Sequence, residues 1–219
     1  MNDTIRYETQ AWQAIYRSDA LRKRRFATHR KKIQKINLVD EPKTSRILDV
    51  CCGEGEMLDL LVQNGFTNLT GLDLPRKSAG EIRNKSWKYV EGSAAELPFE
   101  NSSFDFILCA HSLHHLWPAE NIKKFLAEAY RCLKSGAKLA LIDHYNSPQL
   151  QIALSLLLSP LGRITKWSRL FQQQHLEEKE MLFDYLRHWT EVSARIKEFS
   201  FTTLSYQKDL FFFYWVLRK

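Results

Sequence analysis

The sequence lacks any apolar run that could cross a membrane. Its longest apolar stretches, near Ile152–Leu158 and Leu210–Leu217, are far shorter than the ~20 residues that a spanning helix needs. The N-terminus, MNDTIRYETQ, has none of the apolar core of a signal peptide. These absences predict a cytoplasmic protein.

Cysteine is scarce, and its spacing is typical of neither disulfides nor zinc sites. The four cysteines are Cys51, Cys52, Cys109 and Cys132, with no CxxC pair among them. A metal held by nearby histidines and Asp143 would lack a familiar ligand spacing, so the sequence predicts no metal site.

Excess charge of one sign is absent from most of the chain. Residues 1–46 hold 12 Lys and Arg against 5 Asp and Glu, a balance of +7 that equals the net charge of the whole chain. The centre of this region is the run 22–35, RKRRFATHRKKIQK. It is compatible with a nucleic acid, an anionic membrane surface or an acidic substrate, but a solvated helix face is an equally good explanation. The sequence does not predict the oligomeric state.

The 219 residues fit one domain, and their pattern alternates strand and helix. Short apolar runs at 46–50, 68–73, 88–91, 104–110 and 137–143 are separated by helical segments, including 56–63 and 118–134. This order favours a doubly wound, mostly parallel α/β sheet of seven strands, of the Rossmann-like type. The last two strands, about 199–206 and 210–217, are joined by a loop too short for a helix, so they must pair antiparallel.

We therefore expect a single domain over 1–219 with four parts. These are a basic N-terminal helical lid (1–45), a ligand-binding core (46–146), a helical insertion (147–198) and C-terminal strands (199–219).

The strongest motif is ILDVCCGEG, residues 47–55. An apolar strand ends near Asp49, and a turn with Gly53 and Gly55 leads into a helix. Glycines allow a ligand to approach the backbone closely, and ligands of open parallel sheets lie beyond the carboxyl ends of the strands. Asp73 closes the second strand, where nucleotide-binding sheets place the acid that binds ribose hydroxyls. A nicotinamide-dependent oxidoreductase would need G-x-G-x-x-G here, and CCGEGE lacks the third glycine.

The chain resembles class I S-adenosylmethionine-dependent methyltransferases, in the small-molecule group that includes the ubiquinone/menaquinone C-methyltransferases. The segments ILDVCCGEG, TGLDL, EGSAAELPFENSSFDFILCAHSLHHL and KLALIDH carry this resemblance over residues 47–144. It implies the cofactor S-adenosyl-L-methionine, the product S-adenosyl-L-homocysteine and a small-molecule methyl acceptor. Two positions depart from the family's pattern: Cys51 stands where glycine is usual, and Ser93 where many members have aspartate.

The resemblance also implies roles for the candidate site residues. Asp49 and the turn Cys51, Cys52, Gly53, Gly55 would hold the methionine part, and Asp73 the ribose, with Leu74 against the adenine. Ser93 and Ala94 would meet the adenine edge, and the backbone of Cys109 and Ala110 would line the methionine side.

Histidines at strand ends are candidate general bases, since their pKa suits proton transfer near neutrality. We expect His111 and His144 to serve best, whereas one histidine of Leu113-His114-His115-Leu116 more simply packs or caps a turn.

The acceptor stays open. An apolar helix at 150–158 fits either a lid over an apolar acceptor or plain core, and Trp12, Tyr16, Trp167 and Phe171 would join such a lid. CAHSLHHL replaces the NPPY-like turn of enzymes that methylate base amino groups. An alternative is a non-catalytic or RNA-associated relative that binds the same cofactor.

Overall fold

The structure is a computed structural model, and it describes residues 18–75 and 85–219. Trp12 and Tyr16 lie outside the described residues.

Within these residues a seven-stranded sheet has the order β3-β2-β1-β4-β5-β7-β6. The strands β1 to β5 run parallel, and β7 is antiparallel to both β5 and β6. The predicted fold class is confirmed. The strand bounds are β1 Ile47–Val50, β2 Leu69–Asp73, β3 Lys88–Glu91, β4 Phe104–Ala110, β5 Leu133–His144, β6 Thr202–Lys208 and β7 Phe212–Arg218.

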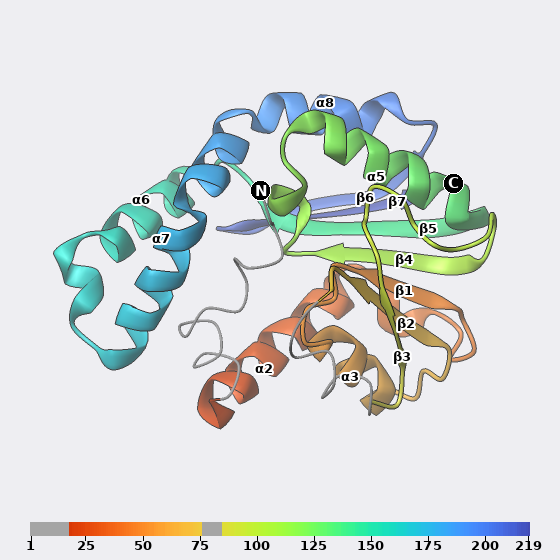
Figure 1. Cartoon of the computed structure of the whole chain (residues 1–219), viewed down its shortest axis with the longest axis horizontal. Helices are drawn as coiled ribbons and strands as arrows, with labels where there is room; N and C mark the ends of the chain where they lie inside the picture. Colours follow the sequence, from red (N-terminus) through yellow and green to blue (C-terminus); the bar gives the residue numbers. More distant parts are fainter. Residues whose placement is uncertain (1–17, 76–84) are drawn as a thin grey trace.

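Helices cover both faces of the sheet (Figure 1), with α2 and α3 on one face and α5 and α8 on the other. The segments α6 and α7 extend beyond the sheet, and α7 contacts η3, which follows β4. The helix bounds are α2 Asp19–Lys35, η2 Leu38–Asp40, α3 Glu56–Gln63, η3 Leu113–Leu116, α5 Ala119–Cys132, α6 Pro148–Leu158, η4 Pro160–Arg163, α7 Lys166–Arg187 and α8 Trp189–Glu198. None of the described helices has the length and apolar character to span a bilayer.

Local sequence explains several helix ends. Ser147 accepts a hydrogen bond from the Leu150 amide at the start of α6, and Thr165 with Ser168 forms a capping box at the start of α7. Gly65 follows the end of α3 with φ of +86°, as expected for the residue after a helix C-cap.

The helix expected over 118–134 ends earlier than its glycine indicates. The helix α5 stops at Cys132, and the chain enters β5 directly at Leu133, which pairs with Phe104. Gly136 therefore lies inside a strand, with φ of +77° and its amide bonded to the Lys219 carbonyl. Pairing with β4 and β7 overrides the local stop signal, and the glycine accommodates the irregularity.

Candidate functional site

The candidate site lies at the carboxyl edge of the parallel strands. Val50 is paired with Leu72 on β2 and with Cys109 on β4, and Cys109 is paired with Leu141 on β5. Because parallel strands end at the same edge, the loops after β1, β2, β4 and β5 meet there. The sheet order reverses between β1 and β4, which is where open α/β sheets bind ligands.

The turn after β1 has left-handed backbone at three positions. The φ angles are +60° at Cys51, +56° at Gly53 and +71° at Gly55. Glycine adopts this region without steric cost, whereas a Cβ is penalised. This explains why glycine would suit position 51, and it makes Cys51 a strained residue of the turn.

Gly55 is also required for close packing. A Cβ at this position would lie 2.0 Å from the Trp87 ring, and the Trp87 indole donates a hydrogen bond to Asp59 of α3 at 2.9 Å. The turn therefore packs against a tryptophan fixed by the helix that follows it.

Asp49 and Asp73 lie on adjacent strands. The Asp73 carboxylate accepts hydrogen bonds from the amides of Gly53 at 2.7 Å and Leu74 at 2.8 Å, which ties the end of β2 to the first turn. Asp49 is 2% exposed, and no described group donates a hydrogen bond to its carboxylate. Burial, and secondarily the Asp73 carboxylate, raise the pKa of Asp49 to about 8.

The other predicted cofactor residues lie along the same edge. The Cys52 amide donates to the Leu72 carbonyl at 3.0 Å, and Leu74 is 37% exposed. Ser93 is exposed and caps its own loop through the Ala95 amide, whereas Ala94 is buried. At the end of β4, Cys109 is buried and Ala110 is half-buried.

Both predicted bases lie in a cluster on the β4–β5 side of the edge, which we call the histidine chamber: Lys32, His111, His114, Asp143, His144 and Phe212. Lys32, His114 and Asp143 are buried, whereas His111, His144 and Phe212 are half-buried. The ring centroids of His111 and His144 are 6.3 Å apart, and Phe212 packs against both. Burial lowers the pKa of His144 to about 4 and that of His111 well below its usual value, so both rings are neutral at pH 7.

Lys32 of α2 enters this chamber. Its Nζ is in hydrogen-bonding contact with His111 Nε2 and lies 3.9 Å from the Phe212 ring centroid. The residue is 4% exposed, and burial lowers the pKa of Lys32 to about 7. The ammonium therefore loses its proton far more easily than that of a surface lysine.

His114 and Asp143 form a buried dyad. His114 Nδ1 is 2.9 Å from the nearer Asp143 oxygen, and the His114 amide donates to the other oxygen at 3.0 Å. Burial opposes charge on both groups, but each stabilises the other's ionised form. Consequently the pKa of His114 is raised, and the pKa of Asp143 is lowered to about 2.

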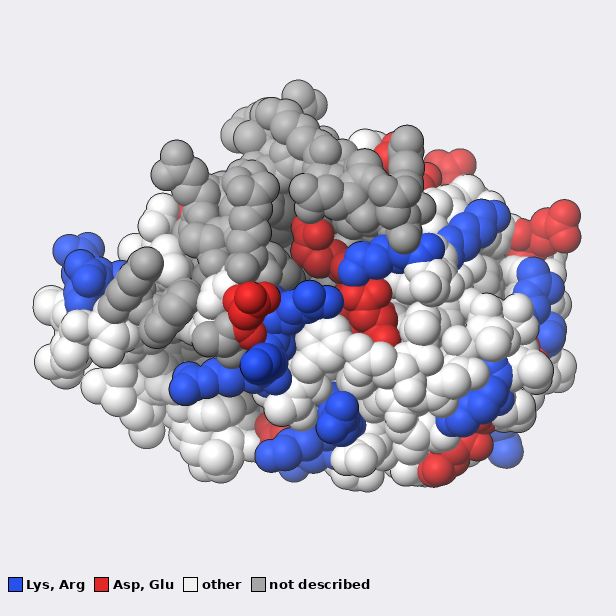
Figure 2. All heavy atoms as spheres, turned by 90° about the horizontal axis from the view of Figure 1, so that it is seen from below, with Lys and Arg blue, Asp and Glu red and all other residues white. Residues whose placement is uncertain are grey.

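The basic run 22–35 lies on α2 and is only partly available to solvent. Arg25 binds Glu56 at 2.7 Å, Lys35 binds Asp209 at 2.7 Å, and Lys32 is buried. Figure 2 shows basic and acidic side chains interspersed over one face of the molecule instead of a continuous basic surface. Arg22, Lys23, Arg24, Arg30 and Lys31 are the exposed basic residues of this run.

The fold and the edge together define a class: a doubly wound α/β protein with a glycine turn after β1 and an acidic residue at the end of β2. A family model described as "Methyltransferase domain" matches residues 48–141. An uncharacterized methyltransferase of Synechocystis is 36% identical over 45% of this chain and 46% of its own length. A demethylmenaquinone methyltransferase of Listeria welshimeri is 31% identical over 49% of this chain and 48% of its own length.

The chain spans about half the length of the curated relatives it matches. In fold, it is similar to an S-adenosylmethionine-dependent methyltransferase from Mesorhizobium loti, with a TM-score of 0.59, 15% identity, and coverage of 85% of this chain and 96% of the other. The predicted resemblance is therefore confirmed: residues 48–141 match a methyltransferase domain, and the described chain shares the fold of an S-adenosylmethionine-dependent methyltransferase.

Sequence reasoning missed Lys32, Trp87 and the pairing of His114 with Asp143. Lys32 is one of several similar cations in its run, and its burial depends on β4 and β7. From the sequence, Asp143 was considered with the histidines only as a metal ligand, although its place beside η3 at a shared sheet edge could have indicated the dyad.

Proposed function

We propose that this chain binds S-adenosyl-L-methionine at the β1–β2 edge and transfers its methyl group to a small-molecule acceptor. The observation that carries the proposal is Asp49, a buried carboxyl group to which no described residue donates a hydrogen bond, beside a turn that is tied to Asp73. Burying such a group is unfavourable unless a cation or donor meets it. When bound, the cofactor supplies both positive charge and an electrophilic methyl group.

The residues present fit this ligand. Asp73 fits the ribose because it is a carboxylate at the end of β2, and a carboxylate accepts hydrogen bonds from hydroxyls. Leu74 offers an apolar surface for the adenine, with Ser93 and Ala94 at its edge. The turn Cys51, Cys52, Gly53, Gly55 and the backbone of Cys109 and Ala110 would surround the methionine part.

The histidine chamber would serve the acceptor. His111 and His144 remain the proposed bases, since a neutral imidazole can accept a proton from a hydroxyl, an ammonium or an acidic carbon. Lys32 would favour an acceptor that becomes anionic, because its ammonium lies against His111. Holding the acceptor in line with the methyl group is the other contribution expected of the chamber.

We further propose that the methyl acceptor is an apolar molecule. Ile152 and Leu156 of α6 are 61% and 54% exposed, and Leu161 of η4 is 60% exposed. These side chains are compatible with capture of an apolar molecule near α7, and one relative is named for demethylmenaquinone. The inward contacts of Lys32 and Lys35 favour a role for α2 in the site over nucleic-acid binding.

A cytoplasmic location is also part of the proposal. All four cysteines lie in the described part of the chain, and they are thiols, not disulfides. This state suits a reducing compartment.

The test is calorimetry with S-adenosylmethionine, followed by detection of S-adenosylhomocysteine with a panel of quinols, phenols and amines. Asp73→Ala should weaken cofactor binding by about 10- to 100-fold, because charge-assisted hydrogen bonds are lost. Exposed Glu100→Gln is the control, and circular dichroism reports folding. Unchanged affinity in Asp73→Ala would refute the ribose assignment, and binding without turnover on any acceptor would favour the non-catalytic relative.

A further inference from the structure

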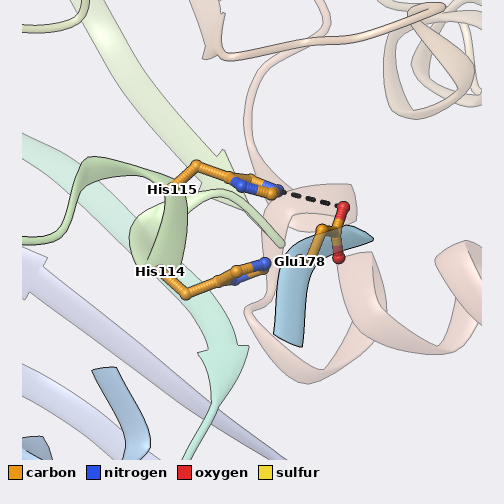
Figure 3. Close-up of side chains that lie close together, drawn as sticks. All are labelled: His114, His115 and Glu178. Atoms are coloured by element: carbon orange, nitrogen blue, oxygen red, sulfur yellow. Dashed lines mark ion pairs between the residues drawn. The ribbon is translucent and has the colours of Figure 1, made fainter. Parts of the chain in front are cut away.

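Three side chains outside the cofactor edge converge at the contact between η3 and α7. Figure 3 shows His114 and His115 of η3 directed toward Glu178 of α7. One ligand-type atom from each residue lies within 4.8 Å of the other two. Two imidazoles and a carboxylate are a common donor set of zinc sites that have three protein ligands.

Among the described residues, no hydrogen-bond donor explains the burial of Glu178 Oε1. The residue is 9% exposed, and its Oε1 is buried without a hydrogen bond. The nearest imidazole nitrogen, His115 Nε2, is 3.9 Å away, beyond hydrogen-bond length. Native structures satisfy almost all such buried oxygens, so this one calls for a ligand.

His114 is oriented as metal-bound histidines usually are. Its Nδ1 is held by the Asp143 carboxylate at 2.9 Å, so Nε2 is the nitrogen left to face Glu178. A carboxylate behind the ring fixes the tautomer and makes the outer nitrogen a better donor, which is the usual second layer of a zinc site. Asp143 is fully buried, so this support is rigid.

We propose that His114, His115 and Glu178 bind a divalent transition-metal cation, with Zn²⁺ the best match to this donor set. Tetrahedral zinc with bonds of ~2.0–2.1 Å holds its ligand atoms about 3.4 Å apart. The observed cluster therefore closes by on the order of 1 Å when it binds. Three protein ligands leave a fourth position for water or the oxygen of a small molecule. Cysteine and histidine spacing did not predict this site, because Glu178 joins it from a distant helix.

The experiment uses the full chain, stripped with a chelator and titrated with Zn²⁺ against a chromophoric competitor. We expect one equivalent to bind. Glu178→Gln and His115→Gln should each lower the Zn²⁺ affinity at least about tenfold, the smaller loss seen even for outer-layer changes. Exposed Glu180→Gln, half a turn further along α7, is the matched control and should bind as the wild type does. Co²⁺ should give visible absorption bands of low-symmetry coordination in the wild type, and these should be lost in Glu178→Gln.

Two results would overturn the site: no Zn²⁺ binding to the stripped wild type, or equal affinity in the wild type and Glu178→Gln. The latter would assign the metal to other histidines. Affinity for S-adenosylmethionine, measured on the same Glu178→Gln sample, should be unchanged. The metal site and the proposed cofactor site therefore succeed or fail separately.

Discussion

The two sides of the carboxyl edge handle charge in opposite ways. On the β1–β2 side, Asp49 is buried beside a second carboxylate, and the pKa of Asp49 is raised to about 8. On the β4–β5 side, the Asp143 carboxylate is already paired with His114. The other ionisable side chains of the histidine chamber, Lys32, His111 and His144, are all basic. A cationic ligand would therefore complement the β1–β2 side, whereas an anionic ligand would complement the β4–β5 side.

This difference indicates two ligands of complementary charge. A cationic ligand would stabilise the ionised form of Asp49. An acceptor that becomes anionic on losing a proton would be stabilised by the Lys32 ammonium. Burial makes both effects strong, because charge interactions are poorly screened away from water. Under the proposed function, the fold would place the cofactor and the acceptor on opposite sides of a single sheet edge.

The largest expected effect is a loss of stability from a substitution in the turn on the β1–β2 side. Gly55→Ala should lower the free energy of unfolding by about 3 kcal/mol or more, because the new Cβ meets Trp87 in a left-handed turn. Gly65→Ala shares the left-handed backbone but meets no atom within 4 Å, so it should cost only about 1 kcal/mol. Urea unfolding measures both, and equal losses would show that packing on Trp87 is unimportant.

The next expected effect is the pH dependence of stability that the burial of Lys32 in the histidine chamber predicts. The folded pKa of about 7 lies below the ordinary 10.5, so the unfolded chain binds more protons between these values. Stability should therefore rise with pH from 7 to 9 by up to about 1.4 kcal/mol per pH unit from this group. Lys32→Met should remove that rise, whereas exposed Lys31→Met should keep it. Urea unfolding at the two pH values decides, and parallel behaviour of the two variants would contradict a buried ammonium.

A smaller expected effect is the pH dependence of cofactor affinity that the raised pKa of Asp49 predicts. A cationic ligand lowers the pKa of Asp49 from about 8, so binding releases a proton below that pH. Affinity for S-adenosylmethionine should therefore rise between pH 6 and 8, by up to about tenfold per pH unit. Calorimetry in buffers of different ionisation enthalpy measures the released proton. Asp49→Asn should flatten the dependence, and an equally steep dependence in this variant would assign the proton elsewhere.

The smallest effect concerns Cys51. Cys51→Gly should relieve the left-handed strain at φ of +60° and stabilise the fold by about 1 kcal/mol, less the entropy that glycine adds to the unfolded chain. Thermal unfolding measures it. A destabilised variant would mean that the thiol's contacts outweigh the backbone strain.

Much of the scaffold was readable before any tertiary information. The glycines of ILDVCCGEG, the acid that ends β2 and the apolar strand runs are local features, and each leads to the element found in the structure. The sequence did not predict where α5 ends and β5 begins, because the pairing of Leu133 with Phe104 overrode the local stop signal of Gly136.

By itself, the sequence determined the sheet, its antiparallel C-terminal pair and the turn beside Asp49 and Asp73, because these depend on residues that are near one another in the chain. Only the tertiary structure decided which charges are buried together. Lys32 meets His111 across 79 positions, and Glu178 meets His115 across 63. The energy of a buried charge depends on what packs around it from every side, and no local pattern records those neighbours.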